Sequence, residues 1–295
     1  MRLTIPEEEL MSSGHKGCQG CGGVMAMRYA LKALGRNTMV VIPACCWTVL
    51  EGEFPYTCLR VPLLHTAFET AASASSGVRA ALKVRGKDDV TVMAWAGDGG
   101  TFDIGIQALS GAVERNEDFV YVCYDNEGYM NTGIQRSSST PYGAWTTTTP
   151  VDAFEKAHKK NMVDIMVAHE IPYTATACIA YPEDLVRKMQ KAKEIRGAKF
   201  IHILSPCPSG WRFPSNLTVK LARLAVETNI FPLYEVDHGK YTISRKPRKR
   251  PARDYLALQG RFRHLSDQVA AEIQAKVDEN WEKLLKKEDD SKSRE

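Results

Sequence analysis

The sequence predicts an α/β protein with a mostly parallel sheet and helices on both of its faces. Apolar runs of strand length occur at residues 90–96 and 119–124, as is typical of strands buried on both faces. Residues 104–115 lie between them and carry apolar side chains at helical spacing. The order strand, turn, helix, strand indicates a parallel sheet.

The remaining elements follow in chain order from an entry arm at residues 1–13 and a glycine-rich loop at 14–23. We expect further helices at 24–34, 65–84, 153–169, 182–195, 217–227 and 265–287, and further strands at 38–43, 173–177 and 200–204. Residues 128–150 lack clear periodicity, and loops of this length inside a compact domain are often functional. A polar tail closes the chain at 289–295.

Composition and charge bound the class of protein. The 295 residues are 44% hydrophobic and 25% charged, which matches an average globular protein. We expect an α/β domain at 1–212 and an extension at 213–295, with helices and a basic segment that pack on the domain or on partner subunits. The net charge of +4 is small, and the basic run at 245–253 lacks interleaved aromatic residues, so we expect no nucleic-acid partner.

The chain is expected to be cytoplasmic and to have no membrane part. Its apolar runs fall far short of the ~20 residues that a membrane span needs. A secretory pattern, with a basic start and an apolar run, is not recognisable at the N-terminus. Eight cysteines in such a chain favour metal binding or buried thiols over disulfides.

A diphosphate–magnesium site is predicted at two neighbouring strand ends. Gly97-Asp98-Gly99-Gly100 follows one buried strand, and Asn126, 28 positions after Asp98, ends the next. Ligands of parallel sheets bind at the carboxyl ends of strands. A carboxylate and an amide oxygen suit Mg²⁺, and glycines let the main chain approach phosphates. The alternative is a plain turn after a strand.

Four cysteines form a second candidate site. Cys18 and Cys21 make a CxxC in the glycine-rich loop, while Cys46 and Cys207 end two strand-like runs. Four thiolates fit an iron–sulfur cube or a structural zinc, and spacing alone does not separate these. A third alternative makes Cys46 and Cys207 buried small residues. Three more cysteines lie in apolar surroundings and are expected to be core thiols: Cys58, Cys123 and Cys178.

The stretch GDGGTFDIGIQALSGAVERNEDFVYVCYDNEGYMNTGIQRSSSTPYGAWTTTTP, from Gly97, resembles the β subunit of pyruvate:ferredoxin oxidoreductase and of related 2-oxoacid:ferredoxin oxidoreductases. The similarity extends from about residue 14 to residue 264. It includes GWR at Gly210 and LQGRFRH at Leu258. A GDG followed by Asn some thirty positions later is the thiamine-diphosphate motif.

The resemblance implies a thiamine-diphosphate-binding fold and assigns its site. Asp98 and Asn126 bind Mg²⁺ through their side chains and Gly128 through its carbonyl, and Asn131 lies beside the thiazolium and the substrate as the catalytic residue. The cofactor also contacts the glycines of the first motif, Gly97, Gly99 and Gly100. In this family, cysteines matching Cys18, Cys21, Cys46 and Cys207 hold one [4Fe–4S] cluster. Register with FPY at Phe54 favours Cys46 over its neighbour Cys45.

The implied reaction is the CoA-dependent oxidative decarboxylation of a 2-oxoacid, with electrons passing through the cluster to ferredoxin. Thiamine activation needs a Glu, for which Glu69 and Glu127 are candidates in this chain. The family supplies it from a second, pyrimidine-binding α-type subunit. We therefore expect activity only with partner subunits, including a ferredoxin-like one. The basic run at 245–253 is expected to be solvated or to dock a subunit, ferredoxin or the phosphates of CoA.

Pyruvate is the first choice of substrate. Relatives acting on pyruvate commonly have Cys-Met-Glu where this chain has Cys46-Trp47-Thr48, so aryl or branched 2-oxoacids and oxalate are alternatives. A more distant alternative is a non-redox thiamine enzyme subunit with a structural zinc. A zinc-stapled interaction subunit without chemistry is the third class.

Overall fold

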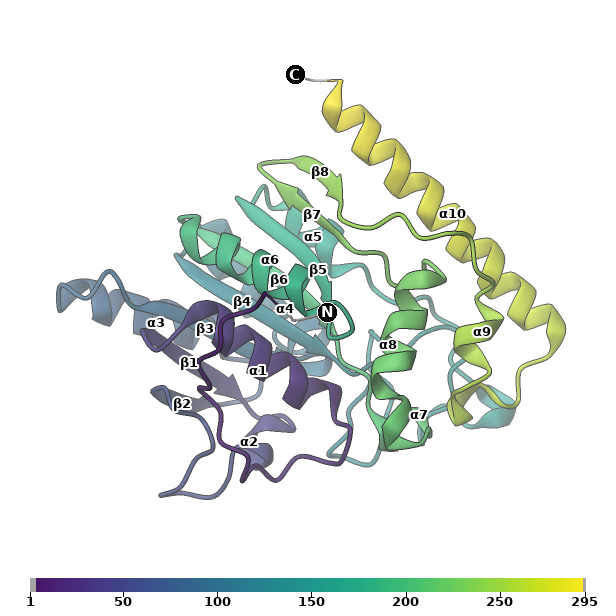
Figure 1. Ribbon diagram of the computed structural model, residues 1–295, viewed down its shortest axis with the longest axis horizontal. Helices are drawn as coiled ribbons and strands as arrows, with labels where there is room; N and C mark the ends of the chain where they lie inside the picture. Colours follow the sequence, from purple (N-terminus) through teal and green to yellow (C-terminus); the bar gives the residue numbers. More distant parts are fainter. Residues whose placement is uncertain (1–3, 294–295) are drawn as a thin grey trace.

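The computed structural model describes residues 4–293 and contains an eight-stranded sheet in the order β2-β1-β3-β4-β6-β5-β7-β8 (Figure 1). The strands are β1 (Thr38–Pro43), β2 (Leu63–Thr66), β3 (Thr91–Gly97), β4 (Phe119–Asp125), β5 (Tyr173–Cys178), β6 (Ala198–Leu204), β7 (Tyr234–Asp237) and β8 (Lys240–Ile243). β1 to β6 pair in parallel, and β7 and β8 continue the sheet antiparallel. The predicted, mostly parallel α/β sheet is confirmed.

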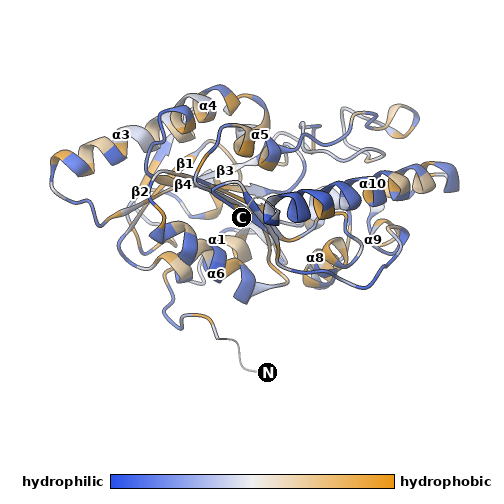
Figure 2. Ribbon diagram, turned by 90° about the horizontal axis from the view of Figure 1, so that it is seen from above, coloured by the Kyte–Doolittle hydropathy of each residue, from blue (hydrophilic) through white to orange (hydrophobic). Residues whose placement is uncertain are grey.

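Helices cover both faces of the sheet (Figure 2). α1 (Gly22–Leu34) and α6 (Pro182–Glu194) pack on one face, and α3 (Ala71–Val84), α4 (Ile106–Glu114) and α5 (Met162–Ala168) on the other. Because both faces are covered, every residue of β4, β5 and β6 is buried, which explains their continuous apolar runs. The other helices are α2 (Trp47–Leu50), α7 (Pro208–Trp211), α8 (Thr218–Glu227), α9 (Arg253–Leu256) and α10 (Asp267–Lys292).

Two predicted helices are shorter than their periodicity indicated. Within residues 65–84 only α3 is helical, because the preceding segment pairs with β1 as the edge strand β2. Within 153–169 only α5 is helical. It begins after Asn161, whose side chain accepts a hydrogen bond from the amide of Asp164 at 3.1 Å and caps the helix. Residues 154–161 therefore run as a loop toward the carboxyl ends of the strands.

The C-terminal part joins the sheet, which the sequence pattern did not predict. β7 pairs with β5 and β8 with β7, so strands from both sides of residue 212 share one sheet. α10 continues to Lys292, so the expected polar tail is helical over 289–292. The domain division at residue 212 stays a prediction. Among residues 4–293, none of the helices has the length and apolarity to cross a membrane.

The basic run at 245–253 folds back on acidic side chains of this chain. Arg250 pairs with Glu227 at 2.8 Å and with Asp254 at 2.7 Å, and Lys246 pairs with Glu288 at 2.5 Å. These charges are thus partly balanced within the chain.

Glu288 ties α10 to the edge of the sheet. Its side chain is buried and accepts a hydrogen bond from the amide of Ile243 in β8 at 2.7 Å, beside the ion pair with Lys246. Burial raises the pKa of Glu288, but the hydrogen bonds from Lys246 and Ile243 outweigh it and hold the pKa at about 2, below the ordinary 4.5.

We predict that Glu288→Ala lowers the free energy of unfolding by about 1–3 kcal/mol at neutral pH, because the Ile243 amide loses its partner. The folded-state pKa lies below the unfolded value, so the stabilisation is present above pH 4.5 and fades as the pH falls toward 2. Urea titrations at several pH values should show the difference shrinking in acid. The exposed Glu282→Ala on the same helix is the control; equal losses in both variants would contradict the prediction.

Candidate functional site

Four adjacent strands deliver the predicted site residues to one edge of the sheet. β1, β3, β4 and β6 are neighbours in the sheet and run parallel. Cys46, Asp98, Asn126 and Cys207 follow their carboxyl ends in that order. Parallel sheets place ligand sites at this edge.

Three oxygen atoms converge at the ends of β3 and β4. The side-chain oxygen of Asn126 lies 3.0 Å from Oδ1 of Asp98 and 2.9 Å from the carbonyl oxygen of Gly128. In this orientation all three groups are acceptors, and a cation between them would remove their repulsion; with the amide turned over, its nitrogen would donate to the other two oxygens. Neighbouring ligands of an octahedral Mg²⁺, each about 2.0–2.1 Å from the ion, lie about 3 Å apart. The oxygens therefore have the spacing of one face of such a site.

Asp98 is buried and held from one side. Ser137 donates a hydrogen bond to Oδ2 of Asp98 at 2.5 Å, which leaves Oδ1 facing Asn126. Burial raises the pKa of Asp98 well above its usual range, and the charge of Asp125 raises it further. A cation at the converging oxygens would favour the ionised carboxylate.

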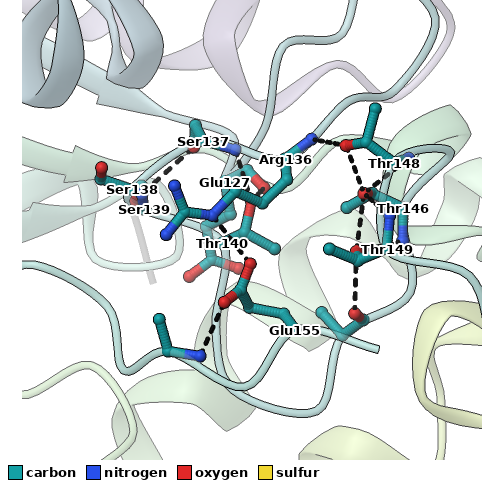
Figure 3. Close-up of polar contacts among 12 residues, drawn as sticks. Glu127, Arg136, Ser137, Ser138, Ser139, Thr140, Thr146, Thr148, Thr149 and Glu155 are labelled. Carbon is teal, nitrogen blue, oxygen red and sulfur yellow. Dashed lines mark hydrogen bonds and ion pairs between the residues drawn. The ribbon is translucent and has the colours of Figure 1, made fainter. Parts of the chain in front are cut away.

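The loop after β4 is fixed through consecutive serines. Ser138 is hydrogen-bonded to Asp103, and Ser139 donates to both oxygens of Asp125 at 2.7 Å. Figure 3 shows the same loop closed on itself where Arg136 meets Glu155, at 2.8 Å. The long loop predicted to be functional is thus an ordered wall of the site.

Glu127 stands between two of the predicted metal ligands and is fully engaged. Its backbone has φ +63°, and its amide donates to Oδ1 of Asp125 at 2.9 Å. One carboxylate oxygen pairs with Lys159 at 2.8 Å and the other with Arg261 at 2.6 Å. Glu127 is therefore not a free carboxylate for activating a cofactor. Glu69, the other candidate, is exposed.

Aromatic packing explains the glycines of the first motif. A Cβ on Gly99 would lie 2.2 Å from the ring of Tyr129, and one on Gly100 would lie 3.3 Å from the ring of Phe68. Tyr129 also donates a hydrogen bond to Asp103 at 2.7 Å. The rings thus pack against this segment only because Gly99 and Gly100 have no side chains.

The predicted cluster cysteines gather beside the oxygens. Burial raises the pKa of Cys46, and charge on Cys207, Cys21 or Asp98 would raise it further. Burial likewise raises the pKa of Cys207 to about 11, with Cys21 and Cys18 adding to the effect. Such thiols ionise readily only when bound to cations.

Close packing brings the cysteine-bearing segments into contact. A Cβ on Gly22, the first residue of α1, would lie 2.7 Å from the nitrogen of Pro206, so the CxxC loop reaches the end of β6. The Cys207 sulfur accepts a hydrogen bond from the amide of Gly210 at 3.3 Å. Within residues 4–293 no three His, Cys, Asp or Glu side chains are close enough to hold a single metal ion. A cube spreads its four ligands over four irons and needs a wider spacing.

Cys45 and Cys46 have different surroundings. Both cysteines are partly exposed, and burial of their thiols raises the pKa of each. The sulfur of Cys46 lies 4.0 Å from the side-chain nitrogen of Asn126. Cys46 therefore lies beside the predicted magnesium ligand Asn126.

Other predictions lie at the margin of the site or away from it. Asn131 is exposed in the loop beyond Met130, and its role stays a prediction. Trp47 is completely buried and packs edge-on against Trp95 at 6.1 Å. A cavity of about 370 Å³ lies between α10 and the ends of β5 and β6; it borders Glu127 but not Asp98.

The sequence pattern missed the residues that support the site. They make buried polar contacts with Asp98, with Asp125 at the end of β4 or with the turn that follows it: Ser137, Ser139, Lys159, His202, Trp211 and Arg261. Trp211 and Arg261 lie in the GWR and LQGRFRH stretches, which resemblance singled out without a role. Lys159 lay in a segment interpreted as a helix.

Comparison with known proteins agrees with this geometry. Residues 45–203 match the family model of the thiamine pyrophosphate enzyme C-terminal TPP binding domain. The chain is 54% identical to the ketoisovalerate oxidoreductase subunit VorB of Pyrococcus horikoshii, over 97% of this chain and 95% of the relative. It is 52% identical to the pyruvate synthase subunit PorB of Methanothermobacter thermautotrophicus, over 96% and 99%.

A solved structure shares the fold. The 2-oxoglutarate:ferredoxin oxidoreductase from Magnetococcus marinus, with 2-oxoglutarate, coenzyme A and succinyl-CoA bound, superposes with a TM-score of 0.59. The match covers 76% of this chain and 81% of that chain at 22% identity.

Proposed function

Since the chain belongs to the family of 2-oxoacid:ferredoxin oxidoreductase β subunits, we propose that it holds thiamine diphosphate, Mg²⁺ and one [4Fe–4S] cluster and oxidatively decarboxylates a 2-oxoacid with its partners. CoA is the acyl acceptor and ferredoxin the electron acceptor in this proposal. We also infer a cytoplasmic location, because all eight cysteines are free thiols, as is typical of a reducing compartment.

The position of one side chain, Asn126, carries the proposal. One end of its amide lies 3.0 Å from Oδ1 of Asp98 and 2.9 Å from the carbonyl oxygen of Gly128, and the other end lies 4.0 Å from the sulfur of Cys46. The oxygen site and the thiol site are therefore separated by a single side chain, that of Asn126. Oxygen ligands suit Mg²⁺ and thiolates suit iron–sulfur clusters. A reaction that takes electrons from thiamine needs such proximity.

The residues of this chain would act by positioning. Thiamine diphosphate, when bound, supplies the carbanion chemistry and takes up the electrons released by decarboxylation. Asp98, Asn126 and Gly128 would hold its diphosphate through Mg²⁺, and Cys18, Cys21, Cys46 and Cys207 would hold the cluster. The glycines of residues 97–100 leave the main chain open to the phosphates. The Ser137 hydrogen bond keeps one oxygen of Asp98 away from the ion.

The thiamine activator is proposed to come from a pyrimidine-binding partner subunit. Glu127 is bound by Lys159 and Arg261 and Glu69 is exposed, so neither is set against a cofactor ring within this chain. A ferredoxin-like subunit is the proposed next electron carrier. Asn131, exposed beside the site, is the proposed catalytic contact to the substrate.

The substrate is proposed to be a small 2-oxoacid, with pyruvate first and branched 2-oxoacids second. The relatives include a pyruvate synthase subunit and a ketoisovalerate oxidoreductase subunit at nearly equal identity. Trp47, the position that departs from pyruvate-acting relatives, fills the core against Trp95, so this departure does not by itself favour a larger substrate.

To identify the substrate, the complex is purified anaerobically and assayed on a panel of 2-oxoacids with CoA and a viologen dye. We expect CoA-dependent dye reduction, fastest with pyruvate or a branched 2-oxoacid. Visible absorbance that bleaches on reduction should accompany it. A colourless complex that contains zinc and no iron would contradict the redox proposal.

Asp98→Ala should abolish Mg²⁺-dependent thiamine-diphosphate binding and leave the cluster absorbance in place, because Asp98 contributes one of the three converging oxygens. Binding is measured by calorimetry on the purified complex. Exposed Asp152→Ala is the control. Retained affinity in Asp98→Ala would rule out the magnesium assignment.

Cys46→Ser and Cys45→Ser separate the two neighbouring cysteines. We predict that the Cys46 variant loses iron and bleachable absorbance, whereas the Cys45 variant keeps both, because it is the sulfur of Cys46 that lies beside Asn126. Iron and labile sulfide are quantified per subunit. The reverse pattern would transfer the ligand role to Cys45.

A further inference from the structure

We propose that Arg261 is the positioning residue of the turn 126–128, and that by anchoring Glu127 it sets the affinity of the site for the magnesium–diphosphate group. The inference rests on the proposed function, which assigns Asn126 and Gly128 to the metal. Arg261 lies 134 residues after Glu127, in the segment beyond the cofactor-binding part of the sheet.

Arg261 and Lys159 hold Glu127 from two sides. Nη2 of Arg261 lies 2.6 Å from Oε2 of Glu127, and Nζ of Lys159 lies 2.8 Å from Oε1. The side chains of Arg261 and Glu127 are 2% and 5% exposed. Because this ion pair is buried, the loss of either partner would leave an unpaired charge away from water, which is strongly destabilising. Glu127 is thereby kept from rotating toward the neighbouring ligands.

Hydrogen bonds to its carbonyl groups also fix the backbone of the turn 126–128. The carbonyl of Asn126 accepts a hydrogen bond from the indole of Trp211 at 2.6 Å, and the carbonyl of Glu127 accepts one from Thr140 at 3.0 Å. These two carbonyls are occupied. The next one, of Gly128, lies 2.9 Å from the side-chain oxygen of Asn126. The left-handed φ of Glu127 produces this reversal and is unfavourable for a residue with a Cβ.

Arg261 also packs against Trp211, whose indole donates the hydrogen bond to the carbonyl of Asn126. Its guanidinium lies over the ring of Trp211 at 4.0 Å from the centroid, and its Nε donates to Gln259 at 2.9 Å. Trp211 ends α7, the short helix that starts immediately after Cys207. One planar cation thus contacts both the side chain of Glu127 and the indole that holds Asn126. Lysine has the charge but lacks a planar group whose donors lie on separate nitrogens.

The charge balance explains why a cation is needed there. Asp98, Asp125 and Glu127 are three buried carboxylates on adjacent segments. Lys159 pairs with both Asp125 and Glu127. Without Arg261, Lys159 would be the only lysine or arginine within residues 4–293 paired with these two carboxylates. The freed oxygen of Glu127 would then attract another cation close to the metal.

The test compares Arg261→Met, Arg261→Lys and Arg263→Met in the full chain within its purified complex. Calorimetry measures the Kd of thiamine diphosphate at several Mg²⁺ concentrations. We expect Arg261→Met to raise the Kd by roughly 10–100-fold, the usual effect of removing a residue that orients a metal ligand. Arg261→Lys should recover part of the loss. Exposed Arg263→Met should bind like the wild type.

Melting temperatures without cofactor separate positioning from general support. A lower melting temperature with an unchanged Kd in Arg261→Met overturns the inference. If Arg261→Met does not fold, the double variant Glu127→Gln with Arg261→Gln, which leaves neither buried charge unpaired, is measured instead. A raised Kd supports the inference and a wild-type Kd overturns it.

The wild-type titration distinguishes a failure of the proposed function from a failure of the inference about Arg261. Mg²⁺-dependent binding that is absent in the wild type overturns the proposed function and the inference together. Binding that is present in the wild type, lost in Asp98→Ala and unchanged in the Arg261 variants overturns the inference alone.

Discussion

The balance of buried carboxylates beneath the strand ends is the constraint on which the rest of the structure depends. Asp98, Asp125 and Glu127 are removed from water, and carboxylates in that position need cations or several hydrogen-bond donors. Asp125 receives hydrogen bonds from His202 and Ser139 and pairs with Lys159. Burial raises the pKa of Asp125, but Lys159 and His202 outweigh burial and hold the pKa below its usual range. Asp98 receives only partial compensation, which makes its free oxygen the natural place for a metal ion.

This constraint gathers segments that are far apart in the chain. Lys159 comes from the loop before α5, where a capped helix start at Asn161 frees the preceding residues to reach inward. Arg261 comes from beyond the last strand, and Trp211 from the short helix after β6. Each contributes a donor or a cation to the same turn. The C-terminal part is consequently bound to the cofactor half of the molecule by charge as well as by the strands β7 and β8.

The position of the thiol site depends on the same turn, residues 126–128. One end of the Asn126 amide lies beside Asp98 and Gly128 and the other end beside Cys46, so the two sites share one residue. Of the two adjacent thiols, that of Cys46 lies 4.0 Å from the side-chain nitrogen of Asn126. Gly22 allows the CxxC loop to approach Pro206, and thereby Cys207. The chain belongs to the 2-oxoacid:ferredoxin oxidoreductase β subunits, and we propose that electrons leave thiamine past the residue that the two sites share.

The sequence by itself determined the parallel sheet and the strand ends, because continuous apolar runs and the glycines after them depend on local burial and turn geometry. Asp98 and Asn126 are placed at the ligand-binding edge in this way, whereas the choice of Cys46 and Cys207 as cluster ligands depends on the family resemblance. The tertiary structure decided the rest. The strands β2, β7 and β8 have only four residues each, and the two edge strands, β2 and β8, are half-exposed, so their patterns are weak. Lys159 and Arg261 carry no local signal, since a buried charge is recognisable only when the distant carboxylate that stabilises it is in place.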